Sequence, residues 1–429
     1  MYERHIIQVE ERLPFLSMVP LSFQHLFSMF GASVLVPLLF KIDPATVLLM
    51  NGVGTLLYFV LTKFKVPAFL GSSFAFLSPV FAVLAAQSYN DALGGFIAAG
   101  FVFLMVGLIV KFTGLTWIDI VFPPAAMGAI VAIIGLELAP VAAKMAGLVL
   151  DTSNPTAYMN PKVLLVSLVT LGVVMIGTVV FRGFMAIIPI LVGVIAGYGV
   201  AFCTGMIDFT PVMHASVFRL PTFYAPHFNL AAIITILPAS LVVIAENIGH
   251  LVVTGNIVDR DLVKNPGLHR SLIGNGISTM LSGFCGSVPT TSYGENIGVL
   301  AITKVYSVWV IGGAAVISII IAFIGTFSAL IGTIPGAVMG GVSLMLFGVI
   351  AASGIRMLVD EKVDYSKPRN LVLTASVLVV GLSGMHIQLG TVSLSGMALG
   401  TIFSICVSLI FYVFEKMGLM NDVSKKEIA

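Results

Sequence analysis

Two carboxylates lie in apolar surroundings, and each begins the same tetrapeptide. Residues 246–249 and 295–298 both read Glu-Asn-Ile-Gly, in a chain of 429 residues of which only 9% are charged. An ionised carboxylate at the centre of a bilayer costs at least about 2.5 kcal/mol, so an acid in such a segment is a functional candidate. Carboxylates accept hydrogen bonds from a ligand and take up protons. Glu246 and Glu295 are therefore our candidate residues for ligand binding and proton coupling.

Polar side chains near these acids extend the candidate site. His250 follows Glu246 by four residues, so the two share one face of a helix, and we expect His250 to take part in proton coupling. Gln24 and His25 lie together in the first apolar segment, and Asn296 follows Glu295; we expect these three to have supporting roles.

The same residues argue against several other chemistries. The chain has neither HExxH nor the repeated Glu-x-x-His of a di-iron bundle, so no metal is expected. It also has no GxxxxGK[ST] loop for ATP and no acidic cluster for a magnesium diphosphate. We therefore expect no cofactor, no nucleic-acid partner and no enzymatic activity.

The elements that position these residues are membrane helices. Hydrophobic residues make up 58% of the chain, its mean hydropathy is +1.09, and apolar runs of roughly 20 residues recur along it. Such a chain is an all-α polytopic membrane protein. The first twelve residues mix acids with bases, unlike a secretory signal, so we expect the N-terminus to be retained.

Apolar runs between polar residues predict fourteen spans, and the lipid bilayer is thus the main partner of the chain. The predicted spans are 17–38, 44–62, 66–86, 92–111, 122–140, 161–181, 184–205, 230–254, 270–286, 287–303, 305–327, 335–354, 370–386 and 393–414. Seventeen of the 21 Lys and Arg residues then fall on one side. This asymmetry predicts that residues 1–16 and the tail 415–429 both lie in the cytoplasm.

Three pairs of stretches indicate an internal duplication. Pro20-Leu21-Ser22 matches Pro238-Ala239-Ser240, "NGVGTLL" from residue 51 matches "NGISTML" from residue 275, and "PPAAMG" from residue 123 matches "PGAVMG" from residue 335. Because each half holds seven spans, the second copy must enter the membrane upside down. Inverted repeats, here 17–205 and 230–414, are typical of secondary transporters.

Two stretches at corresponding places in the halves do not read as ordinary helices. Residues 65–79 and 285–298 open with Pro, Gly, Ser, Thr and aromatic residues, which favours extended backbone before a helix begins near Phe74 or near Gly294. Non-helical backbone at membrane depth occurs only inside protein or around a cavity. We therefore expect two half-helices to direct their N-terminal N–H groups at one central site.

The sequence also resembles a known family. "ENIGVLAITK" at 295–304 is similar to the signature of the nucleobase-ascorbate transporters, and "QH" at 24–25 is similar to a second short motif of that family. Stretches such as "GSSFAF", "FPPAAMGA", "AENIGHLV" and "NPGLHR" extend the resemblance over nearly the whole chain. Glu at the head of the signature favours the bacterial members that carry uracil together with protons.

The resemblance implies a particular architecture. Spans 1–4 and 8–11 would form a core domain and spans 5–7 and 12–14 a gate domain, with short antiparallel strands in spans 3 and 10. The protein would be a multi-pass protein of a bacterial cytoplasmic membrane, and a homodimer through the gate domain is compatible with the family pattern.

The resemblance also implies roles for individual residues. Glu246 and Glu295 would contact the base, and backbone N–H groups around Phe74 and Gly294 would hold its carbonyls. Three further residues would pack near the ring: Ala32, Tyr293 and Phe347. The family pattern has Tyr at the position of Phe347, so a polar role is in doubt there.

Other functions stay open at this point. A purine or xanthine permease of the same family would differ by pocket size, which the sequence does not give. An anion transporter or channel of similar build would need a basic residue facing the site, and no basic residue falls near the middle of a predicted span. A membrane enzyme would convert its ligand instead of releasing it unchanged.

Overall fold

The computed structural model describes residues 6–149, 159–389 and 392–421, so part of both predicted cytoplasmic ends lies outside the described residues. Within this part of the chain, seven helices are long and apolar enough to cross a membrane, or eight if one bent pair counts as a single span. The chain is therefore a helical, multi-pass membrane protein, as the composition predicts. Four shorter apolar helices of 10–17 residues accompany them.

The helices, in chain order, are Phe15–Ser28 (α1), Phe30–Phe40 (α2), Pro44–Leu61 (α3), Leu77–Ala86 (α4), Tyr89–Thr113 (α5), Thr116–Val121 (α6), Pro124–Met145 (α7), Pro161–Val180 (α8), Pro189–Cys203 (α9), Thr210–Met213 (α10), Leu230–Val258 (α11), Leu268–Phe284 (α12), Gly294–Thr303 (α13), Val308–Ala322 (α14), Gly325–Gly332 (α15), Gly336–Asp360 (α16), Pro368–Leu382 (α17) and Gly396–Lys416 (α18). Three short helical turns are Phe74–Phe76 (η1), Gly183–Ile187 (η2) and Val263–Gly267 (η3), and the strands are Leu70–Ser72 (β1), Thr290–Ser292 (β2), His386–Leu389 (β3) and Val392–Ser395 (β4).

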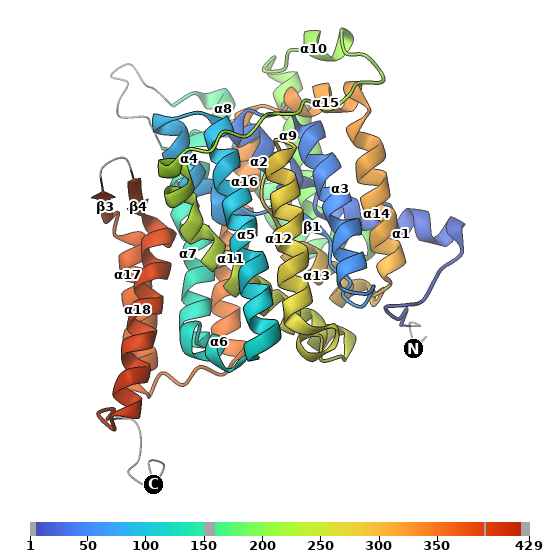
Figure 1. The fold of residues 1–429 in the computed structure, drawn as a ribbon. Coiled ribbons are helices and arrows are strands. Elements are labelled where there is room, and N and C mark those ends of the chain that lie inside the picture. The colour runs from blue at the N-terminus through green and yellow to red at the C-terminus, as the bar shows by residue number, and fades with distance from the viewer. Residues whose placement is uncertain (1–5, 150–158, 390–391, 422–429) are drawn as a thin grey trace.

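The long helices run side by side and pair across the two halves of the chain (Figure 1). α7 packs most extensively on α16, α5 on α12, and α3 on α14. Glycines allow close approach of these helices. A Cβ atom on Gly100 of α5 would lie 2.7 Å from the carbonyl oxygen of Gly276 on α12, and a Cβ atom on Gly276 would lie 2.7 Å from the carbonyl oxygen of Gly100. Small residues that let backbones approach are the usual basis of helix packing in membranes.

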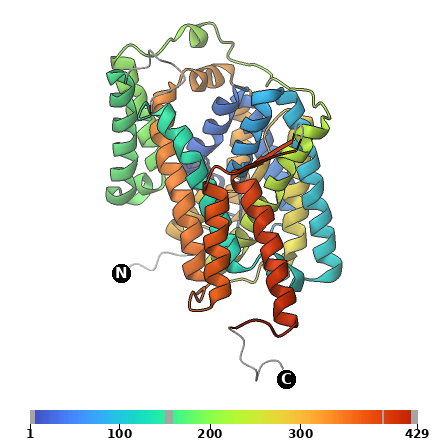
Figure 2. The same ribbon diagram turned by 90° about the vertical axis from the view of Figure 1, so that its left-hand side faces the viewer.

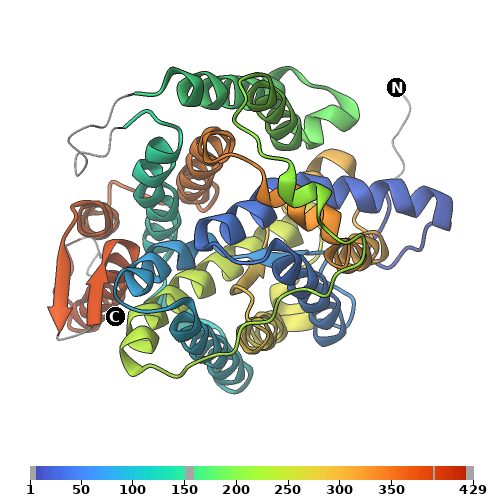
Figure 3. The same cartoon turned by 90° about the horizontal axis from the view of Figure 1, so that it is seen from above.

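The remaining helices lie around this bundle. Seen from above, α8 and α9 (green) lie along one edge and α17 and α18 (red) lie along another (Figure 3). Strands β3 and β4 form an antiparallel hairpin that joins α17 to α18 at one end of the molecule (Figure 2). The sequence analysis predicts helical spans at 370–386 and 393–414 and does not predict this hairpin. Polar and apolar residues nevertheless alternate along its strands with period two, as is typical of a β-strand.

Two predicted spans are each divided into two helices. The span predicted at 17–38 is α1 and α2, which meet at Met29 with a bend of 43°. There the backbone N–H of Met29 reaches the carbonyl of Leu26, so the regular helical ladder is interrupted. In the span predicted at 305–327, α14 ends at Ala322 and α15 begins at Gly325. The helix is interrupted there because the backbone of Phe323 and Gly325 pairs with the segment that connects the two halves.

That connecting segment, residues 204–229, includes α10 and crosses one end of the bundle (Figure 1). Asp43, a buried residue that caps the N-terminus of α3, fastens it. Its carboxylate accepts hydrogen bonds from the backbone N–H groups of Ala45 (3.1 Å) and Thr222 (3.0 Å), and from the hydroxyl of Ser328 (2.9 Å). It also forms an ion pair with Arg219. Burial raises the pKa of Asp43, but these hydrogen bonds outweigh it and leave the pKa below its ordinary value.

We expect Asp43→Asn to destabilise the protein by about 1–3 kcal/mol, because an amide nitrogen would face donors and the charge opposite Arg219 would be lost. The apparent melting temperature of the purified protein in detergent measures this loss. Asp208→Asn is the control, since the Asp208 carboxylate is exposed and bonds only to nearby Thr210.

The pH dependence of this effect has a defined sign. Because the pKa of Asp43 is lower in the folded protein, its contribution is present at neutral pH and is lost as the pH falls through that lowered value. The difference in melting temperature between wild type and Asp43→Asn should therefore shrink in acid. A difference that grew in acid would contradict this account.

Candidate functional site

Two short strands meet at the centre of the site. β1 pairs antiparallel with β2 in the register Leu70↔Ser292, Gly71↔Thr291 and Ser72↔Thr290. Two further backbone bonds extend the ladder: the N–H of Ser73 donates to the carbonyl of Pro289 (2.9 Å) and the N–H of Tyr293 donates to that of Phe69 (3.1 Å). The ladder satisfies backbone groups that could not otherwise be placed at membrane depth.

A helix begins directly after each strand. η1 and then α4 follow Ser73, and α13 follows Tyr293, so the helix starts predicted near Phe74 and at Gly294 agree with the structure. Neither Ser73 nor Tyr293 caps its helix with a side-chain hydrogen bond. Neither first turn, whose N–H groups carry partial positive charge, is thus capped by the residue before it, and the two turns begin at the two ends of a three-residue ladder.

The two predicted acids come together beside this ladder. Glu246 lies in the middle of α11, and Glu295 is the second residue of α13. α11 packs against α13, and the imidazole of His250, one helical turn after Glu246, lies next to Gly294, so the two acids lie near each other. Both side chains are half-buried, and Oε2 of Glu246 is buried with no hydrogen-bond partner in the described residues. A buried acceptor without a partner requires a ligand, a water molecule or a proton.

His250 faces the junction between β2 and α13. Its Nδ1 lies 3.2 Å from the hydroxyl oxygen of Ser292. Its Nε2 lies 3.6 Å from the position that a Cβ atom would take on Gly294. The imidazole is thus one helical turn from Glu246 and next to the start of α13.

His25 and Asn296 form a second polar contact on the other side of α13. Nδ2 of Asn296 lies 2.8 Å from Nδ1 of His25, and Oδ1 of Asn296 accepts the backbone N–H of Phe69 (3.2 Å). Both residues are buried, as is Gln24. Asn296 therefore ties α1 and α13 to the chain that enters β1.

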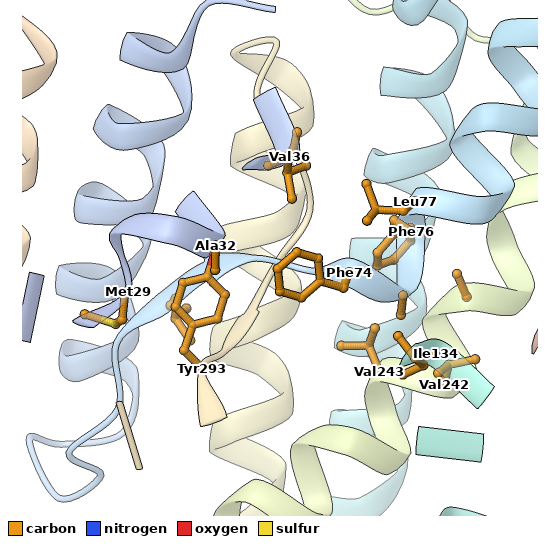
Figure 4. Packing of buried hydrophobic residues seen from close by; sticks show 14 of the residues in the cluster. Met29, Ala32, Val36, Phe74, Phe76, Leu77, Ile134, Val242, Val243 and Tyr293 are labelled. Atoms are coloured by element: carbon orange, nitrogen blue, oxygen red, sulfur yellow. The ribbon is translucent and has the colours of Figure 1, made fainter. Parts of the chain in front are cut away.

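Buried apolar side chains pack together where η1 and α13 begin (Figure 4). Ala32 of α2 lies next to the ring of Tyr293, and the ring of Phe74 lies at the same level. Phe347 of α16 packs edge-on against Phe74, with ring centroids 5.9 Å apart and an interplanar angle of 84°. Of the three ring-packing residues that the resemblance implies, Ala32 lies beside Tyr293, and Phe347 packs on Phe74, for which the resemblance implies only a backbone role.

One glycine allows this arrangement. A Cβ atom on Gly71 would lie 2.2 Å from Cε2 and 2.3 Å from Cζ of Tyr293, so only a glycine in β1 lets the ring lie flat against the strand. The sequence analysis did not identify Gly71, because a single glycine in a glycine-rich chain gives no local signal.

A third membrane-embedded acid was also missed. The sequence analysis predicts membrane-embedded acids only at Glu246 and Glu295, yet Glu137 lies inside α7 and is half-buried. Its carboxylate accepts hydrogen bonds from the hydroxyl of Ser78 (2.6 Å) and from the backbone N–H of Met397 (2.9 Å). Glu137 lies near the end of the predicted span 122–140, where an acidic residue is not unusual, so the sequence gives no signal for it.

Sequence comparison identifies close relatives. Residues 16–390 match the profile of a family described as a permease family. The chain is 58% identical to a uracil permease of Paenibacillus larvae over 417 aligned residues. This alignment covers 97% of this chain and 99% of the relative. It is 58% identical over 410 residues to the uracil permease of Escherichia coli K12, an alignment that covers 95% of this chain and 94% of the relative. It is 44% identical over 402 residues to the uracil permease of Bacillus subtilis, and that alignment covers 92% of each chain.

Solved structures share the fold at low identity. The transmembrane domain of the cyanobacterial bicarbonate transporter BicA aligns with a TM-score of 0.64 at 14% identity, over 94% of this chain and 99% of that one. The murine solute carrier 26 family member A9 anion transporter aligns with a TM-score of 0.70 at 12% identity, over 95% and 70%. At such identities the likeness concerns the fold alone. The profile match and the nearly end-to-end relatives show that this chain belongs to the permease family.

Proposed function

We propose that this protein imports uracil across the cytoplasmic membrane of a bacterium, coupled to protons, by alternating access. Relatives named uracil permeases at 58% identity support the substrate. The observation that carries the proposal is the convergence of two half-buried carboxyl groups, two uncapped helix N-termini and a cluster of aromatic side chains.

These groups fit the chemistry of uracil. Uracil is a flat, neutral ring with N–H donors and carbonyl acceptors along its edge. The carboxyl groups of Glu246 and Glu295 would accept its N–H groups, and the backbone N–H groups around Phe74 and Gly294 would donate to its carbonyls. Tyr293 and Phe74, with Ala32 and Phe347 beside them, would enclose the ring.

The architecture that we propose has fourteen spans in two inverted repeats, 17–205 and 230–414. Packing supports it: α5 on α12 and α3 on α14 are the same contact with the halves exchanged. Spans 1–4 and 8–11, with β1 in span 3 and β2 in span 10, form a core domain, and spans 5–7 and 12–14 form a gate domain. Both termini are cytoplasmic in this proposal, and a homodimer would form through the gate domain.

Proton coupling follows from the pair of acids. Two ionised carboxylates around an empty site repel each other in a medium of low dielectric constant, which opposes movement of the core domain past the gate. We infer that a proton on Glu295, delivered in the neighbourhood of His250, removes one charge and permits that movement. Glu246 then serves chiefly to bind the base.

The two acids should therefore respond differently to removal of their charge. Glu246→Gln should weaken equilibrium binding of labelled uracil about ten-fold or more, because a charge-assisted hydrogen bond is lost. Glu295→Gln should bind uracil but lose accumulation driven by a pH gradient in proteoliposomes.

Glu361→Gln, at the exposed end of α16, provides the matched control and should behave as wild type. Normal accumulation driven by the pH gradient in both Glu246→Gln and Glu295→Gln would disprove the assignment of the two acids.

Gly71→Ala tests the packing of the Tyr293 ring against β1 without changing a polar group. Its new Cβ atom would displace the Tyr293 ring, so uracil binding should fall at least ten-fold while the protein still purifies as a folded species. Gly172→Ala in α8 is the control, because a Cβ atom there meets nothing within 4 Å. Equal binding by both variants would mean that Tyr293 does not line the site.

Substrate range is tested in the same proteoliposomes. Excess unlabelled uracil should abolish uptake of labelled uracil driven by a pH gradient, whereas excess xanthine should leave it unchanged. Competition by xanthine at equal concentration would instead favour a purine permease.

A further inference from the structure

Glu137 is a half-buried acid to which the proposed site gives no role. It lies on α7, and its two carboxylate oxygens are bonded to two other elements, Ser78 of α4 and the backbone of Met397 at the start of α18. A carboxylate with both oxygens bonded in this way holds three elements at one point.

The start of α18 is shaped around this carboxylate. Gly396 has a φ of +53°, and a Cβ atom there would lie 1.7 Å from Oε1 of Glu137. A side chain at residue 396 would both strain the backbone and occupy the position of the carboxylate. The contact between α7 and α18 is therefore built for a carboxylate.

The position of Ser78 links this carboxylate to the proposed substrate site. Ser78 follows Phe74 by four residues, about one helical turn into the half-helix whose first N–H groups would hold the base. In the proposed architecture, α4 belongs to the core domain, whereas α7 and α18 belong to the gate domain. The Ser78–Glu137 hydrogen bond thus joins the two domains close to the proposed ligand.

We propose that Glu137 is a positioning residue that stabilises the present arrangement of the core and gate domains through Ser78, without touching the substrate. The proposal rests on the proposed function, since it requires that the two domains move. The Ser78–Glu137 bond is made in this arrangement and broken in the other one, so it sets the ratio of the two.

The role depends on hydrogen bonding and not on a proton carried by Glu137. Gln at residue 137 could still accept the N–H of Met397 through its oxygen, and its amide group could donate to the Ser78 hydroxyl. Glu137→Gln should therefore keep the contact, whereas Ser78→Ala and Glu137→Ala remove it.

Distances between nitroxide labels on Cys203 of α9 and Cys285 after α12 would test this, with Cys406→Ser leaving only these two cysteines. One label lies in the proposed gate domain and the other in the proposed core domain. Ser78→Ala should change the ratio of the two distance populations about ten-fold, which is what the loss of one hydrogen bond is expected to cause. Glu137→Ala should shift it at least as far, and adding Ser78→Ala to it should have no further effect.

Ser376→Ala is the matched control, because that hydroxyl bonds to the carbonyl of Leu373 within its own helix. It should leave the populations unchanged, as should Glu137→Gln. An unchanged ratio in Ser78→Ala would overturn the proposal, and so would a Glu137→Gln variant that keeps its distances but loses accumulation driven by a pH gradient. Binding of labelled uracil to wild type is measured in parallel, so failure of the proposed function is recognised separately.

Discussion

The backbone ladder between β1 and β2 is the constraint on which the rest of the site depends. Inside a bilayer every backbone N–H and C=O group must find a partner within the protein. Two chain segments that stop being helical at the same depth meet this requirement by pairing with each other, from Phe69 to Ser73 on one side and from Pro289 to Tyr293 on the other. The pairing fixes where η1 and α13 begin, and so fixes where their free N–H groups lie.

Side chains around the ladder serve mainly to hold it. Asn296 binds the N–H of Phe69, the hydroxyl of Thr55 accepts the N–H of Leu70, and the hydroxyl of Thr279 accepts the N–H of Thr290. These bonds come from α13, α3 and α12, three different helices. A ligand bound between the helix N-termini therefore meets groups that are already ordered, so little conformational entropy is lost on binding.

Much of this arrangement could be predicted from the sequence because its signals are local. Glu246 and Glu295 are conspicuous among apolar residues, and the Pro, Gly, Ser and Thr that precede Phe74 and Gly294 predict extended backbone before each helix. The bend at Met29, the roles of Gly71 and Glu137 and the β3–β4 hairpin were missed. The roles of Gly71 and Glu137 depend on partners far away in the chain, and the hairpin is a short alternating stretch between two apolar runs. The bend at Met29 interrupts an apolar run that continues unbroken in the sequence. Periodicity within one segment carries no information about such contacts.

The two halves contribute unequally to the site, and this inequality bears on mechanism. In the proposed repeat, the match of Pro20 to Pro238 places Ser28 opposite Glu246, and the Ser28 hydroxyl is bonded to the carbonyl of His25 within its own helix. Phe74 and Ala75 lie near the position opposite Glu295 in the proposed repeat, so in the proposed site the first half would supply an aromatic ring and backbone N–H groups where the second would supply a carboxyl group. Acids in both halves would place four charges around one small ring, and their mutual repulsion would far exceed what one proton relieves. Two acids from one half leave a charge that a single proton can halve, while the other half provides the apolar surface and the fixed donors that a neutral base requires.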